Sequence, residues 1–385
     1  MGERSYLWAI TATGLKSYPL PGRAKIEKTA RAVSELLSPQ DTALVRSEKW
    51  RNDEYLRQAT ALSEMILKPV AAQLGNKRLL VVADGVLQYI PFSALPIPRN
   101  GSRGGSQARN SQFVPLIVEH EIVNLPSAST LAVLRRETSG RQLAPKAVAV
   151  IADPVFETDD MRVLAATGKV KSGGSANQVA ANLSLLRGRR GGNFARLPAT
   201  QNEARAIEEF TSPADRLIAK GFDASRAQAI SSALSQYRII HFATHGILDR
   251  DNPELSAIVL SLVDRQGNTQ DGYLRLHDIY NLNLPAELVV LSACDSGLGK
   301  EFKGEGLVGL TRGFMYAGAL RVMASLWKVE DEPTAKLMKL FYQGMLKDKL
   351  SAAAALRQAQ IALWQDSQWH APYYWAAFTL QGEWK

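Results

Sequence analysis

The most constraining feature of this 385-residue sequence is a series of short apolar segments in its second half, separated by segments with helical periodicity. The segments read "AVAVIADPVF", "RIIHFATH", "ELVVLSA" and "LRVMASLW". Apolar runs of this length without polar alternation are typical of parallel strands buried on both faces. Because strands that alternate with helices form a mostly parallel sheet covered by helices, the sequence predicts an α/β fold.

The chain divides into two predicted parts, residues 1–140 and 141–385. The first part reads as a smaller α/β unit, with a hairpin around Gly14, helices over 24–37 and 53–74, and a strand, Asp-Gly turn and strand over 78–96. The second part is interrupted at about 157–196 by an aperiodic stretch rich in Gly, Ser and Arg. We expect this stretch to be a mobile basic insertion on the surface.

The charge favours no nucleic-acid partner, although 46 Lys and Arg against 37 Asp and Glu give a net charge of +9. The excess is concentrated in two loops, and neither loop interleaves aromatic side chains that could stack on bases. The nine basic residues of these loops are Arg99, Arg103, Arg109, Lys169, Lys171, Arg187, Arg189, Arg190 and Arg196. Solvated loops are the simpler interpretation.

Composition excludes several other classes. No window approaches 18 consecutive apolar residues, so no membrane span is expected. The first residues do not resemble a secretory signal, and a cytoplasmic location is expected. The single cysteine excludes an internal disulfide and a multi-cysteine zinc site, and we expect no cofactor.

Two reactive side chains lie at the predicted carboxyl ends of strands. His245 ends "RIIHFATH" and precedes Gly246, and Cys294 ends the next strand of this kind. Ligands of such sheets gather at the carboxyl edge, so these two residues can share a cleft although they are about 50 positions apart.

This pair of residue types suits nucleophilic catalysis. A thiol attacks as the thiolate, and an imidazole can accept its proton and later protonate the leaving amine. The tetrahedral intermediate needs preorganised donors, for which the backbone N–H groups of Gly246 and Cys294 are candidates. The alternative is that Cys294 is a small core residue, since a lone cysteine in an apolar run usually is one.

Two other motifs are interpreted as structural and not as parts of a catalytic or binding site. His241 lies in mid-strand and is interpreted as a buried structural residue, because four residues of a strand span about 13 Å, too far for His241 and His245 to bind one metal ion. The sequence 304–309 matches G-x-G-x-x-G, with Asp331 about 20 residues further on. Since it does not follow a strand directly, we interpret its glycines as loop and helix-packing residues and not as a dinucleotide site.

Taken together and in order, several motifs resemble the CHAT domain family. They are "LLVVADGVLQYIPFSALP", "LPATQNEARAI", "HFATHG", "LVVLSACDSGLG", "GEGLVGLTRGFMYAGA" and "SLWKVEDEPT". The resemblance implies a caspase-like fold related to separases, with residues 1–140 as a degenerate caspase-like half. It implies a cysteine endopeptidase with the dyad His245 and Cys294, acting on protein substrates.

The resemblance also implies a regulatory partner, since CHAT domains are often joined to tetratricopeptide repeats, in cis or in trans. A catalytically silent scaffold of the same family stays an alternative. A small-molecule α/β hydrolase is disfavoured because the G-x-S-x-G elbow is absent.

An acidic group after the strand "LRVMASLW" suggests a specificity pocket. Asp331 occupies the aspartate position of the family pattern, and Glu330 precedes it. A carboxylate there could bind the guanidinium of a substrate arginine. The alternative is that Asp331, ahead of Pro333, caps the helix that begins there.

Overall fold

The computed structural model describes residues 4–37, 47–98, 113–168, 194–247, 255–295, 306–327 and 329–384. These residues fall into two compact units. The first contains Met1–Arg135 and Leu326–Lys385, and the second contains Arg136–Lys300 and Gly304–Ser325. The predicted boundary between residues 140 and 141 stays a prediction.

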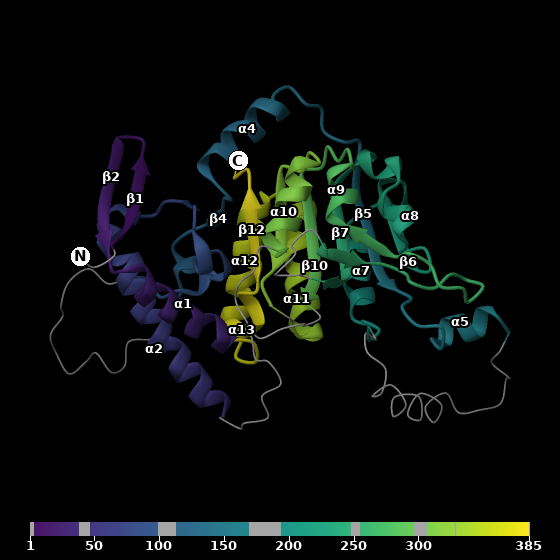
Figure 1. Ribbon diagram of the computed structural model, residues 1–385, viewed down its shortest axis with the longest axis horizontal. Helices are drawn as coiled ribbons and strands as arrows, with labels where there is room; N and C mark the ends of the chain where they lie inside the picture. Colours follow the sequence, from purple (N-terminus) through teal and green to yellow (C-terminus); the bar gives the residue numbers. More distant parts are fainter. Residues whose placement is uncertain are drawn as a thin grey trace. The chain divides into compact units, whose positions relative to one another are not determined.

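The second unit is built on a parallel sheet (Figure 1). Its strands follow the order β11-β10-β7-β5-β6, and every neighbouring pair among them is parallel. The strands are β5 Lys146–Pro154, β6 Arg216–Gly221, β7 Tyr237–Ile247, β10 Leu288–Asp295 and β11 Arg321–Ser325. The predicted α/β class with a mostly parallel sheet is confirmed.

Helices cover both faces of this sheet. The ring of Phe242 on β7 packs on Phe314 of α10 (Gly306–Tyr316), with 5.7 Å between ring centroids. The preceding residue, His241, contacts Glu203 of α7 (Thr200–Glu208). Because successive side chains of a strand point to opposite faces, α10 and α7 lie on opposite sides of β7.

A short antiparallel ribbon extends the sheet beside the end of β7. Strand β8 (Ala257–Val259) pairs with His245, Gly246 and Ile247, and β9 (Tyr273–Arg275) pairs with β8. Strand β5 also pairs with β7, but this pairing ends at Ala243 of β7. The carboxyl end of β7 therefore lies between β10 and β8.

Three further helices of the second unit lie in the connections: α5 Met161–Ala166, α8 Arg226–Ala229 and α9 Leu276–Tyr280. Helix α5 differs from the expected aperiodic insertion over 157–196, because Val163 packs into a buried cluster with Val155 and Val263. The far end also differs, since Arg196 is paired with a buried carboxylate. Residues 169–193 of the insertion lie outside the described residues.

The first unit has a hairpin and a small parallel sheet. Strands β1 (Ser5–Thr11) and β2 (Gly14–Leu20) pair as the sequence predicts. Strands β3 (Leu79–Val81), β4 (Ile122–Asn124) and β12 (Phe378–Gly382) are parallel in the order β3-β4-β12. The helices are α1 Arg23–Leu37, α2 Glu48–Ile66, α3 Ala71–Leu74, α11 Asp331–Tyr342, α12 Ala352–Gln365 and α13 Pro372–Trp375, with α4 Ala128–Thr138 leading to the second unit.

The predicted second strand in 78–96 is wrong. After β3 the chain forms two short 3-10 helices, Gly85–Tyr89 and Phe92–Ala94. Pro91 between them has no N–H to give to a strand ladder. The second of these helices is buried, and the carbonyl of Ala94 accepts a hydrogen bond of 2.7 Å from the Tyr55 hydroxyl.

The predicted helix over 53–74 begins earlier and is interrupted. Helix α2 begins at Glu48 after Ser47, whose hydroxyl accepts the N–H of Trp50. It ends at Ile66, and a 3-10 turn over Lys68–Val70 precedes α3. Pro69 explains the break, because proline cannot donate the helical hydrogen bond.

Within the described part of the chain, no helix is long and apolar enough to cross a membrane.

Gly272 holds the ribbon that flanks the end of β7, because its carbonyl accepts the N–H of Leu260. A methyl group at Gly272 would lie 2.5 Å from the backbone oxygen of Ser261, which cannot move without disturbing this ribbon. We expect Gly272→Ala to lower the free energy of unfolding by about 1–3 kcal/mol, measured by urea denaturation. Gly309→Ala in α10 is the control, since its new methyl meets only Leu276 at 3.8 Å and alanine favours the helix. Equal losses in both variants would contradict the prediction.

Candidate functional site

The two residues predicted to react occupy paired positions on neighbouring strands. Cys294 of β10 is in register with His245 of β7, and Asp295 with Gly246. Neighbouring strands lie about 4.8 Å apart, so this register brings the two backbones as close as a sheet allows. Both positions lie at the carboxyl ends of their strands, where sites in parallel sheets form.

The His245 side chain is buried, with 8% of its surface exposed. Its Nε2 lies 2.6 Å from the carbonyl oxygen of Ala195. The rings of Phe156 and Phe194 pack against the imidazole, with centroids 5.1 and 5.4 Å away. None of these three residues was predicted to take part in the site.

The contact with Ala195 assigns the tautomer of His245. A carbonyl oxygen can only accept a hydrogen bond, so Nε2 carries a proton and donates it. In the neutral imidazole the lone pair then lies on Nδ1. The nitrogen that can accept a proton is therefore the one that does not face Ala195.

His241 has a different environment. It is fully buried, and its Nε2 lies 3.2 Å from Oε2 of Glu203, which is also buried. The predicted burial of His241 is confirmed, but its partner on α7 was not anticipated. The signal was present in "TQNEARAIEEF", where Glu203 falls on the same helical face as the apolar Ala206 and Ile207.

The predicted backbone donors have defined positions in the sheet. Gly246 lies in β7 between Ile258 of β8 and Asp295 of β10. Cys294 is the last but one residue of β10. A role for the N–H groups of Gly246 and Cys294 in holding an oxyanion stays a prediction.

Glu330 and Asp331 lie in the first unit, whereas His245 and Cys294 lie in the second. Both acidic side chains are exposed. Glu330 occupies the N-cap position of α11 without a capping hydrogen bond from its side chain, and Asp331 is the first helical residue. The alternative that Asp331 caps this helix is therefore wrong, because Glu330 occupies the N-cap position. The specificity pocket stays a prediction.

The glycine motif over 304–309 lies partly outside the described residues. Strand β10 ends at Asp295, and Gly306 and Gly309 of the motif belong to α10, which begins at Gly306. Gly304 lies outside the described residues. Within the described ranges, no three His, Cys, Asp or Glu side chains lie close enough to hold a metal ion.

Among protein-family models, that of the CHAT domain matches this chain over residues 56–383. Curated relatives include Tetratricopeptide repeat protein 28 of Homo sapiens, 27% identical over 220 residues, and that of Mus musculus, 30% identical over 190 residues. The matches cover 48% and 40% of this chain but only 8% and 7% of the relatives. The chain thus spans less than a tenth of the length of these relatives.

Solved structures with a similar backbone include two that are matched over most of this chain. One is the separase–securin complex of Saccharomyces cerevisiae, with a TM-score of 0.47 and 10% identity over 99% of this chain and 30% of the other. Another is gingipain R, an Arg-specific cysteine proteinase, with a TM-score of 0.43 and 10% identity over 94% of this chain and 74% of the other.

The buried contact between His241 and Glu203 leads to a prediction about stability. Removing one partner of a buried pair leaves the other polar group without that contact, which costs about 3–5 kcal/mol. We expect His241→Leu and Glu203→Leu each to lower the free energy of unfolding by about this amount. The double variant should lose clearly less than the sum, as measured by urea denaturation of all four proteins. Additive losses, within about 0.5 kcal/mol, would contradict a coupled pair.

Proposed function

Because the chain belongs to the CHAT domain family, we propose that it is a cysteine endopeptidase that hydrolyses peptide bonds of protein substrates. The observation that carries this proposal is the register of His245 with Cys294 at the carboxyl ends of two neighbouring parallel strands. The resemblance of the family to caspases and separases assigns the same two residues to the dyad.

The tautomer of His245 gives each nitrogen a role. Nε2–H stays hydrogen-bonded to Ala195, so Nδ1 is the base that accepts the proton of the Cys294 thiol. The thiolate attacks the carbonyl carbon of the scissile peptide bond. When the C–N bond breaks, the imidazolium returns its proton to the leaving amine. Water then hydrolyses the thioester and releases the thiol.

Ala195 contributes to this chemistry through its carbonyl group. Once Nδ1 is protonated, the imidazole carries a positive charge, and a carbonyl oxygen 2.6 Å from Nε2–H stabilises that charge. The carbonyl thus takes the place that a carboxylate has in a Ser-His-Asp triad. The rings of Phe156 and Phe194 limit the rotation of the imidazole.

A regulatory partner belongs to the proposal. The curated relatives are tetratricopeptide repeat proteins, and this chain corresponds to less than a tenth of their length. We therefore expect a repeat module, in cis or in trans, to control access to the site.

The competing function is a catalytically silent scaffold of the same family. Cys294 is the single cysteine of the chain, so a thiol-reactive probe can label only this residue. A peptidase activates the thiol and a scaffold does not, which makes labelling at mildly acidic pH diagnostic.

We predict that Cys294→Ala and His245→Ala each abolish peptide cleavage, by at least about 10³-fold. His277→Ala is a matched control, because His277 lies on α9 with 66% of its side chain exposed. Cleavage of an unstructured protein substrate, followed by gel electrophoresis and mass spectrometry, measures the effect. Full activity of a folded His245→Ala protein would overturn the dyad, and absence of cleavage and of labelling in the wild type would favour the scaffold.

We further propose that the enzyme cleaves after basic residues, with Asp331 and Glu330 as the residues that recognise them. The prediction is that Asp331→Ala selectively loses substrates with Arg or Lys before the scissile bond. Glu332→Ala is the matched control, since Asp331 and Glu332 both lie in the first turn of α11 and interact alike with its dipole. A peptide library profiled with both variants tests this. Preference of the wild type for Asp or an apolar residue, or the same profile in both variants, would contradict the basic pocket.

A further inference from the structure

A buried carboxylate lies at the same sheet edge as the proposed dyad. Asp153 is next to last in β5, is 1% exposed, and follows Ala152, which is in register with Ala243 of β7. The pairing of β5 with β6 shifts between Ala152 and Pro154, and Asp153 has a φ of 49°. Residues other than glycine rarely adopt this left-handed conformation, so the surrounding contacts must maintain it.

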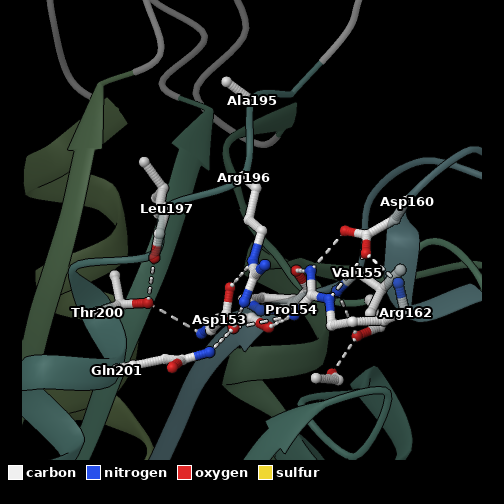
Figure 2. Close-up of polar contacts among 12 residues, drawn as sticks. Asp153, Pro154, Val155, Asp160, Arg162, Ala195, Arg196, Leu197, Thr200 and Gln201 are labelled. Carbon is white, nitrogen blue, oxygen red and sulfur yellow. Dashed lines mark hydrogen bonds and ion pairs between the residues drawn. The ribbon is translucent and has the colours of Figure 1, made fainter. Parts of the chain in front are cut away.

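Three side chains converge on this carboxylate (Figure 2). Arg196 binds it through two parallel hydrogen bonds, from Nε to Oδ1 at 2.9 Å and from Nη2 to Oδ2 at 2.8 Å. Gln201 donates to Oδ2 at 2.5 Å, and Nη1 of Arg162 lies 3.0 Å from the same oxygen. Hydrogen bonding to Asp153 raises the pKa of Arg196, so its guanidinium stays protonated.

The cluster fixes the short segment that contains Ala195. Arg196 follows Ala195 directly, and its guanidinium is anchored on Asp153. The hydroxyl of Thr200 donates to the carbonyl of Leu197 at 2.7 Å and accepts the N–H of Asp153 at 3.1 Å. Two contacts with Asp153 of β5 therefore fix the chain directly after Ala195. One comes from the Arg196 guanidinium and the other from the Thr200 hydroxyl.

The peptide group between Ala195 and Arg196 is the one whose oxygen accepts Nε2–H of His245. We infer that Asp153 is a positioning residue for His245, acting through Arg196 on the carbonyl of Ala195. This inference rests on the proposed function, in which His245 is the base for Cys294. Asp153 itself touches neither the dyad nor a substrate in this scheme, and its effect is to keep Nδ1 as the basic nitrogen in a fixed orientation.

The test measures the thiolate of Cys294 and does not depend on a peptide substrate. Because the chain has one cysteine, the rate of alkylation by iodoacetamide, followed by intact mass, reports this thiol alone. A well-placed imidazolium lowers the apparent pKa of the thiol below the value of about 8.5 for a free cysteine. If the imidazole is displaced, this apparent pKa rises. Alkylation then slows at low pH, where less thiolate is present, and is unchanged at high pH, where the thiol is ionised in either case.

We expect Arg196→Met to shift the midpoint of the pH profile upward and to reduce the alkylation rate at pH 6.5 by about tenfold. Arg196 is suited to substitution because 40% of its side chain is exposed and Asp153 keeps Arg162 and Gln201 as partners. Asp153→Asn should give the same shift. Arg196→Lys should restore part of the rate, since an ammonium keeps the charge but not the two parallel hydrogen bonds.

Asp278→Asn is the matched control. Asp278 is 8% exposed and also binds an arginine, Arg226, through both oxygens, with contacts of 2.5 and 3.2 Å in the same unit. In the described part of the chain, the polar contacts of the Asp278 side chain are with Arg226, Arg275 and His277, and none is with the segment around Ala195. The control should lose comparable stability while it retains the pH profile of the wild type.

Each outcome decides a different point. If Asp278→Asn shifts the profile as much as Arg196→Met, the effect is general loosening and the positioning role is overturned. If His245→Ala shifts the profile but Arg196→Met and Asp153→Asn do not, only the positioning role fails. If His245→Ala keeps the wild-type profile, the proposed dyad itself fails. A shift in the two cluster variants and in His245→Ala, but not in the control, supports the inference.

Discussion

The parallel register between β7 and β10 is the constraint on which the candidate site depends. It pairs the backbone of His245 with that of Cys294, and a slip of either strand by one residue would end this pairing. Several buried residues maintain this register, among them Ile239, Val289 and Phe242. Strand positions that look like ordinary core therefore determine which residues of β7 and β10 are paired at the carboxyl edge.

The strands of the parallel sheet and the residues at its carboxyl edge could be predicted from the sequence. Continuous apolar runs identify β5, β7, β10 and β11, because strands buried on both faces need apolar side chains at every position. The residues at the ends of such runs lie at a common edge of the sheet. This argument predicted that His245 and Cys294 lie near each other. The same argument applies to Asp153 after "AVAVIA", although its partners were not apparent there.

The surroundings of His245 were beyond the reach of sequence patterns for a physical reason. Ala195 acts through a backbone carbonyl, which every residue possesses, so no side chain identifies it. Arg196 was read as one more solvated basic residue of a loop, because periodicity contains no information about a buried carboxylate 43 positions away. In the first unit, likewise, Pro91 outweighed the apolar pattern and replaced an expected strand by 3-10 turns.

The ribbon of β8 and β9 has a consequence for the behaviour of the histidine. Strand β8 pairs with β7 at the position where the register of β5 with β7 has ended, so the backbone at His245 has a strand on each side. Its main chain therefore loses conformational entropy when the sheet forms and not when a substrate arrives. Such preorganisation leaves the imidazole with only its two side-chain torsions, and these are limited by the rings of Phe156 and Phe194. A residue fixed in this way has few orientations open to it, so the position of the Ala195 carbonyl decides which of them the imidazole adopts.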